Sequence, residues 1–240
     1  NNNGFVNGNS HSAEYYNIPV NTINSYHLMG SDALYNLRPR DKNSIGNNEV
    51  FLQPDDHLNG NLNPNGTVPV FTYSSFYTDI NSGIKGERRE FWVFYGYDEA
   101  GAAGVSFSHQ GDWERIILDI IDDNIQGAWL SQHTNLIYYP AEQLEISKSN
   151  GIQTLKVYSA EGSHAHYNKA GDFSILDIMG IDIDKDHTRD GGYQWNITKN
   201  VLPLEQQEWK DYAGAWGEIG TGIQPWGDAT SGPLGPWYKI

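Results

Sequence analysis

The chain has no cysteine, few basic residues and no long apolar run. Without cysteine there are no disulfides, thiolate metal ligands or cysteine nucleophiles. No apolar run approaches the roughly 20 residues of a membrane-spanning helix. Only 15 Lys and Arg stand against 30 Asp and Glu, which gives a formal net charge of −15. This balance argues against a nucleic-acid partner, because there is no basic stripe to neutralise phosphates.

The sequence also lacks two motifs, the Gly-rich loop that binds phosphates and the G-x-S-x-G nucleophile elbow of serine hydrolases. The sequence does contain 8 Trp, 15 Tyr and 8 Phe, which supply bulky core material, together with 26 Gly and 10 Pro. Such a composition is typical of short strands joined by many turns. It predicts a mainly β chain, a β-sandwich of antiparallel strands with long loops and few short helices.

The chain is expected to have two parts that form one compact unit. Residues 1–85 are rich in Asn and turn residues and are expected to be a loop-rich lead-in that wraps the core. Residues 86–240 carry most of the strand signals and are expected to form the β-sandwich domain. Strands are expected at 49–52, 68–73, 91–97, 112–121, 129–131, 136–139 and 154–159, and one short helix at 204–212. The most acidic stretch, 182–192, is interpreted as a solvated acidic turn.

The most informative segment is His109-x-x-Asp112-Trp113-Glu114. It opens a strand, and because side chains alternate along a strand, Asp112 and Glu114 are expected on one face. Gly111 permits a bend that would bring His109 to the same side. These groups can hold a hard cation or move protons. Equally, both carboxylates can be solvated and His109 merely hydrogen-bonded.

Two further histidine motifs follow expected strands. His133 ends Ser131-Gln132-His133, and Ser163-His164-Ala165-His166 comes after the strand near residue 159. Three histidines at strand ends favour a shared site. Of the last pair, His164 is expected to face that site.

Together these motifs resemble the vacuolar protein sorting-associated protein 62 family, and so do segments 190–195, 212–217 and 231–236. The resemblance covers about residues 90–236 and implies no established chemistry.

The His-x-x-Asp-Trp-Glu core is also similar to the signature of necrosis- and ethylene-inducing-like proteins, which are secreted cytolysins. That resemblance implies a β-sandwich, a divalent cation and affinity for sphingolipid glycans. Asp112 would be a direct ligand, with His109, Glu114 and His164 beside it, and Asp98 would replace an upstream aspartate. The cytolysins carry a second histidine where this chain has Gly111, and this difference puts cytolytic activity in doubt.

Two functions are therefore carried forward. The first is a secreted, toxin-like protein that binds a membrane glycolipid, lipid headgroup or glycan through a divalent cation, with calcium or magnesium favoured. Its ligands would come from Asp112, Glu114, His109, His164, His133 and Asp98. The alternative is a metal-assisted hydrolase of an ester, phosphoester or glycosidic bond, in which Glu114 or His109 activates water. No stretch of the given sequence is expected to be a signal peptide, and the oligomeric state is left open.

Overall fold

The computed structural model describes residues 64–80, 82–99, 108–178, 181–211 and 232–240, with short stretches at 6–8, 49–52, 101–102, 105–106 and 215–217. The chain divides into two compact units, each built from separated stretches of sequence. Unit 1 contains residues 1–63, 94–113 and 204–240, and unit 2 contains residues 64–93 and 114–203. The division at residue 85 expected from the sequence stays a prediction.

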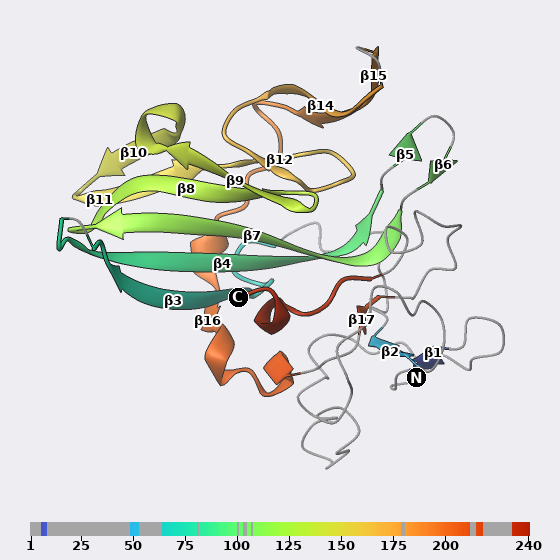
Figure 1. Ribbon diagram of the computed structural model, residues 1–240, viewed down its shortest axis with the longest axis horizontal. Helices are drawn as coiled ribbons and strands as arrows, with labels where there is room; N and C mark the ends of the chain where they lie inside the picture. The colour runs from blue at the N-terminus through green and yellow to red at the C-terminus, as the bar shows by residue number, and fades with distance from the viewer. Residues whose placement is uncertain are drawn as a thin grey trace. The chain divides into compact units, whose positions relative to one another are not determined.

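The largest sheet has six strands in the order β16-β3-β4-β7-β8-β9 (Figure 1). These strands are β3 (Val70–Thr78), β4 (Lys85–Asp98), β7 (His109–Ile121), β8 (Asn124–Gln132), β9 (Asn135–Pro140) and β16 (Val201–Pro203). The pairs β3–β4, β7–β8 and β8–β9 are antiparallel, whereas β16 runs parallel to β3. Strands β4 and β7 are long and pass from one unit into the other.

The other strands form small sheets. Unit 2 contains the pairs β10 (Glu145–Ser149) with β11 (Ile152–Lys156), β12 (Tyr158–Ser159) with β13 (His166–Tyr167), and β14 (Gly171–Ile178) with β15 (Ile181–Thr188). Unit 1 contains β1 (Val6–Gly8), β2 (Glu49–Leu52) and β17 (Ala215–Trp216) in one sheet, and β5 (Gly101–Ala102) with β6 (Val105–Ser106). The helical segments that the structure describes are short 3-10 turns: η2 (Ala141–Gln143), η3 (Ile197–Lys199), η4 (Leu204–Gln206), η5 (Glu208–Asp211) and η7 (Pro236–Tyr238).

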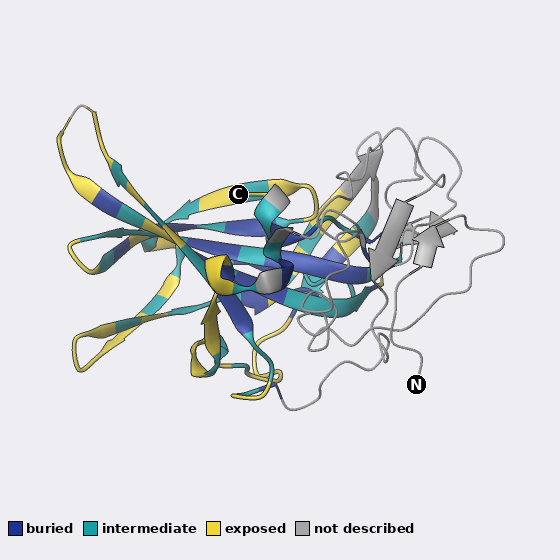
Figure 2. Ribbon diagram, turned by 90° about the horizontal axis from the view of Figure 1, so that it is seen from below, coloured by how far each residue is buried: buried dark blue, intermediate teal, exposed yellow. Residues whose placement is uncertain are grey.

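Turn residues fix the register of two hairpins in unit 2. Asp122 and Asp123, between β7 and β8, have φ of 48° and 57°, and Asn150 and Gly151, between β10 and β11, have φ of 50° and 82°. Two successive residues with positive φ match the twist of the strands in a tight hairpin, and Asp, Asn and Gly adopt that conformation most readily. The buried residues follow the strands, while the hairpin ends are exposed (Figure 2).

Two apolar clusters can be identified among the described residues of unit 2. Ile116, Ala128 and Leu130 are buried on one face of the large sheet, where side chains from β4, β9, β11 and η3 and their flanks pack on them. The second cluster joins Tyr158, Ala160, Ala165 and Tyr167 with Phe173. Burial of this kind stabilises a fold by roughly 1.5–3 kcal/mol per large side chain.

Unit 1 is held by an aromatic core. The ring of Trp113 lies 4.8 Å from Phe94, 5.1 Å from Trp216 and 5.8 Å from Trp209, centroid to centroid. Trp113 and Trp216 are almost fully buried. Trp113, the residue between Asp112 and Glu114 on β7, is therefore a core residue.

The expectation of a mainly β chain with antiparallel strands is confirmed, while the β-sandwich stays a prediction. Two local interpretations are wrong. The stretch 182–192 is not a solvated turn, because most of it belongs to β15 and Asp186 is buried. The helix expected at 204–212 is two separate 3-10 turns, η4 and η5.

Candidate functional site

In unit 1, His109 lies between a carboxylate and a backbone carbonyl. Its Nε2 is 3.3 Å from Oδ2 of Asp98, and its Nδ1 is 2.9 Å from the carbonyl oxygen of Gly111. Asp98 ends β4 and His109 begins β7. Both ring nitrogens are therefore engaged, which fixes the orientation of the imidazole.

The charges around His109 favour its protonated form. Burial by itself would lower the pKa of His109, but the hydrogen bond and charge of Asp98, and then the charge of Asp112, outweigh burial and raise this pKa. Asp98 and Asp112 are both buried. Oδ1 of Asp98 is buried as well, and no described residue offers it a hydrogen-bond partner. An acceptor in this state is costly unless a further group binds it.

In unit 2, the carboxylate of Glu114 is tied to the neighbouring strand. The Ser131 hydroxyl donates to Oε2 of Glu114 and accepts the backbone N–H of Arg115 at 2.8 Å. Nδ1 of His166 is 3.5 Å from the same hydroxyl oxygen. Glu114, Ser131 and His166 are all buried, so this is an internal polar group of strands β7, β8 and β13.

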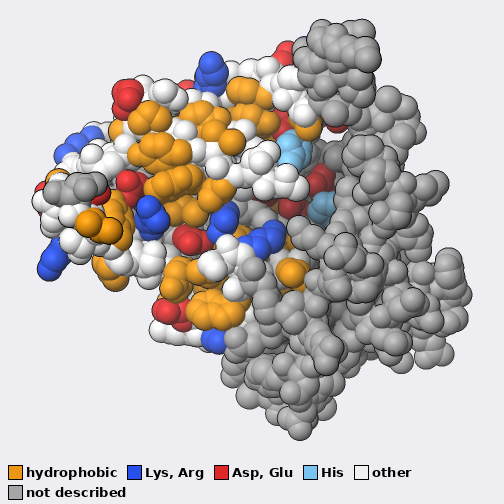
Figure 3. Space-filling model, viewed as in Figure 1, with side chains coloured by type: hydrophobic (Ala, Val, Ile, Leu, Met, Phe, Trp, Pro, Cys, Tyr) orange, Lys and Arg blue, Asp and Glu red, His pale blue; other side chains and the backbone are white. Residues whose placement is uncertain are grey.

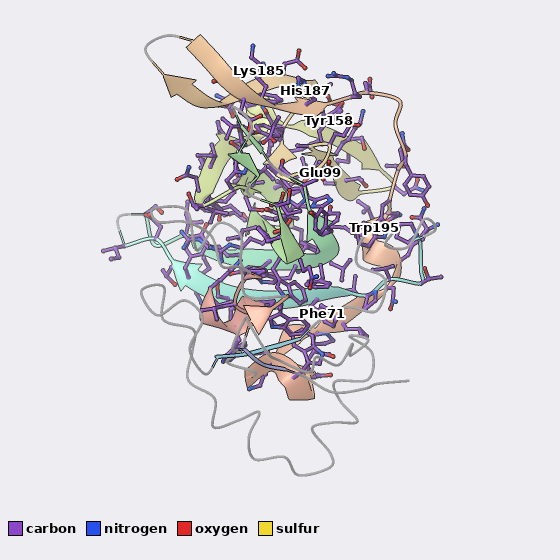
Figure 4. All side chains as sticks on the ribbon, turned by 90° about the vertical axis from the view of Figure 1, so that its right-hand side faces the viewer. Phe71, Glu99, Tyr158, Lys185, His187 and Trp195 are labelled. Atoms are coloured by element: carbon purple, nitrogen blue, oxygen red, sulfur yellow. The ribbon has the colours of Figure 1, made fainter. Side chains whose placement is uncertain are left out.

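A further buried carboxylate of unit 2, Asp186, accepts three side-chain hydrogen bonds. The Ser163 hydroxyl donates to Oδ1, the Tyr167 hydroxyl donates to Oδ2 at 2.6 Å, and Nε2 of His133 is 2.9 Å from Oδ2. Asp186 is only 2% exposed. Strand β15, which carries Asp186, lies against the turn after β12, because the Glu161 N–H donates to the His187 carbonyl at 3.0 Å. His187 on β15 and Tyr158 on β12 are labelled in Figure 4.

These contacts set the protonation states around Asp186. Burial alone would raise the pKa of its carboxyl, but hydrogen bonds from His133, Ser163 and Tyr167 outweigh burial and hold the pKa below the usual aspartate value. Burial and then the Asp186 hydrogen bond raise the pKa of Tyr167, and the charge of Glu114 acts in the same direction. Asp186 is thus an ionised acceptor and Tyr167 a neutral donor.

Both groups lie inside the segment that matches a known family. The model of the vacuolar protein sorting-associated protein 62 family matches residues 90–219, more than half of the chain. The chain belongs to this family. No curated protein and no solved structure was found to match it. All six site residues predicted for this family member fall within the matched segment.

In the structure of this family member, the six predicted site residues do not all contact one another. In unit 1, Asp98, His109 and Asp112 are grouped, and in unit 2 Glu114 contacts Ser131 while His133 contacts Asp186. His133 is the first residue of the two-residue turn between β8 and β9 and has φ of 55°. His164 also has a positive φ, 59°, and it is His166 that lies beside Ser131.

The sequence analysis did not predict that Asp186 is a buried acceptor, or that Ser163 and Tyr167 donate hydrogen bonds to it. The available signal was the alternation of isoleucine and aspartate at 181–184, which is the period of a strand. Within the part of the chain that the structure describes, no three His, Asp or Glu side chains are arranged as a metal ion would require. In the same part, no helix has the length and apolar character needed to span a membrane.

Proposed function

We propose that this chain binds a divalent cation at Asp98, His109 and Asp112, whose side chains would have to move closer together to coordinate it, and that the cation-bound protein binds a lipid headgroup or glycan at a membrane surface. The observation that carries the proposal is the buried Oδ1 of Asp98, which no described residue satisfies. An oxygen of this kind, close to a histidine that also experiences the charge of a second carboxylate, Asp112, suits a hard cation.

The orientation of His109 supports this assignment. Metal-binding histidines commonly donate one ring N–H to a backbone carbonyl, which directs the other nitrogen to the metal. Here Nδ1 faces the Gly111 carbonyl and Nε2 faces Asp98. Asp98 and Asp112 raise the pKa of His109, so a proton on His109 competes with a cation for the same negative charges, and cation binding has to displace it.

A bound cation would supply a charge that offsets part of the net charge of −15 and would offer coordination positions to oxygen atoms of a headgroup or sugar. The hydrolase alternative has less support, because the carboxylate of Glu114, which would activate water, already accepts a hydrogen bond from the buried Ser131 hydroxyl.

The proposal is tested by calorimetric titration of the full chain with calcium, magnesium, manganese and zinc. At least one cation is expected to bind with one-to-one stoichiometry, and Asp98→Asn and Asp112→Asn should each weaken binding at least about tenfold. Asp190→Asn removes the same charge from an exposed residue and should leave binding unchanged. Because His109 must lose its proton, binding should weaken as the pH falls below the pKa of His109.

Absence of binding by all four cations, or equal binding by the three variants, would contradict the cation site. If the cation binds, vesicles of phosphatidylcholine with and without a neutral glycolipid then test the second half of the proposal. Binding of the protein to vesicles is expected with cation and not with chelator. Vesicle binding that chelator does not change would contradict the bridging role.

A further inference from the structure

A group of aromatic side chains and one arginine lies on strands β3, β4, β8 and β9 of the large sheet in unit 2. We call it the aromatic–arginine surface and define it as Tyr77, Arg88, Trp129 and Tyr138. The Arg88 guanidinium carbon is 5.1 Å from the ring centroid of Tyr77 and 4.9 Å from that of Trp129. The rings of Trp129 and Tyr138 are 4.6 Å apart. Figure 3 shows hydrophobic side chains gathered on one face of the molecule with Lys and Arg side chains beside them.

The strand register places these residues on one face. Tyr77 pairs with Gly86 and Trp129 with Tyr138, and Arg88 is two residues from Gly86 on the same strand. Residues that pair directly, and residues two apart on a strand, lie on the same side of a sheet. Arg88 and Tyr138 are exposed, whereas Tyr77 and Trp129 are half-buried.

Two mid-strand glycines allow the tyrosine rings to lie flat on the sheet. A Cβ on Gly86 would be 2.3 Å from Cζ of Tyr77, and a Cβ on Gly127 would be 2.3 Å from the hydroxyl oxygen of Tyr138. The Tyr77 hydroxyl donates to Oδ1 of Asp119 at 2.6 Å, which fixes the ring. Glycine inside a strand lowers its stability and often marks a close approach. The surface is therefore preorganised.

The two neighbouring arginines of β4 are in opposite situations. Arg89 forms a two-point ion pair with Glu87, at 2.8 Å from Nε to Oε1 and 2.9 Å from Nη2 to Oε2. Arg88 stacks on two rings, and no carboxylate of the described residues lies within ion-pair distance of it. Its donors are held in position and face solvent.

We propose that the aromatic–arginine surface binds a neutral sugar. The ring C–H groups of a sugar carry partial positive charge and pack on the negative faces of aromatic rings. Arg88 would donate to hydroxyl oxygens, and Asp119 would accept from a hydroxyl group. One positive and one negative group match a neutral ligand, and the net charge of −15 works against an acidic one. This inference goes beyond the cation site and needs no cation.

The test uses the full chain in chelator, so that a cation cannot contribute. The probes are glucose-, mannose- and galactose-based hexasaccharides, with a galacturonate hexasaccharide as the acidic probe, and calorimetry reports binding. One neutral probe is expected to bind. Arg88→Gln and Trp129→Ala should each lower its affinity at least about tenfold, the size of losing charge-assisted hydrogen bonds or an aromatic contact.

Arg89→Gln is the matched control, because it removes the same charge one residue away and should leave sugar affinity unchanged. Unchanged melting of Arg88→Gln would establish that the variant is folded. The proposal is overturned if no neutral probe binds, if the acidic probe binds more tightly, or if Arg88→Gln and Arg89→Gln behave alike. Asp98→Asn should bind the sugar as tightly as the unmodified protein does. Loss of cation binding therefore leaves the sugar proposal standing, and loss of sugar binding leaves the cation proposal standing.

Discussion

Replacing Gly111 with alanine would place a methyl group inside the contact between β7 and the segment around β17 in unit 1. The added Cβ would lie 1.6 Å from the carbonyl oxygen of Trp216 and 2.7 Å from its carbonyl carbon. Gly111 also has φ of 70°, a conformation that costs an L-residue about 1–2 kcal/mol. Overpacking adds about 1–3 kcal/mol or more. The free energy of unfolding should therefore fall by about 2–5 kcal/mol.

Gly151→Ala separates the two contributions. Gly151 has φ of 82°, but nothing lies within 4 Å of its added Cβ, so only the backbone cost of about 1–2 kcal/mol remains. Gly111→Asn is a second comparison, because asparagine tolerates positive φ but would still clash.

The assay is urea unfolding followed by tryptophan fluorescence, together with melting curves. For a chain of this size 1 kcal/mol corresponds to about 2–4 °C in Tm. Gly111→Ala and Gly111→Asn should both melt well below Gly151→Ala. If Gly111→Ala and Gly151→Ala lose the same stability, the close approach to Trp216 is not what requires glycine at 111.

Three further predictions concern unit 2. Asp186→Ala should lower the free energy of unfolding by about 2–4 kcal/mol, because the buried donors Ser163 and Tyr167 and the partly exposed His133 lose a charged acceptor. Because the pKa of Asp186 is lowered in the folded state, its contribution should be complete above about pH 4 and lost as the pH falls further; an acid-unfolding curve that Asp186→Asn leaves unchanged would contradict this. Leu130→Ala, at a fully buried position, should cost about 2–5 kcal/mol, whereas Ile152→Ala, 71% exposed, should stay within about 0.5 kcal/mol in chemical denaturation. The Asp119 hydrogen bond raises the pKa of Tyr77 to about 12, and Asp119→Asn should bring the tyrosine titration, followed by NMR, back towards about 10.

Much of the fold could be predicted because strand signals are local. The expected strand at 49–52 is β2, and those near 91–97, 112–121 and 136–139 fall within β4, β7 and β9. β-branched runs and alternation report the period of a strand directly. The helix expected at 204–212 failed because the apolar spacing of a helix can also be met by residues of two short turns that pack separately.

The site was less predictable, because its contacts come from residues far apart in the sequence. The resemblance places Asp98 and His109 in one set of ligands, but no pattern in the sequence predicts that they contact each other. The charged neighbours of Asp186 in the sequence favour a solvated turn. Its burial depends on donors from the β8–β9 turn and from the segment around β13, and no local pattern reports such tertiary contacts.

The way each unit is assembled from separate stretches has a consequence for synthesis on the ribosome. Unit 2 is complete once residue 203 has emerged, so its sheets and the Asp186 hydrogen bonds can form while translation continues. Unit 1 needs residues 204–240, which carry Trp209 and Trp216 of its aromatic core. About 90 further residues are therefore synthesised between residues 94–113 and their partners in unit 1. This takes roughly 5–20 seconds at ordinary rates of elongation. During that interval Phe94 and Trp113 lack the partners Trp209 and Trp216, so this segment of the nascent chain is open to chaperones that bind apolar residues.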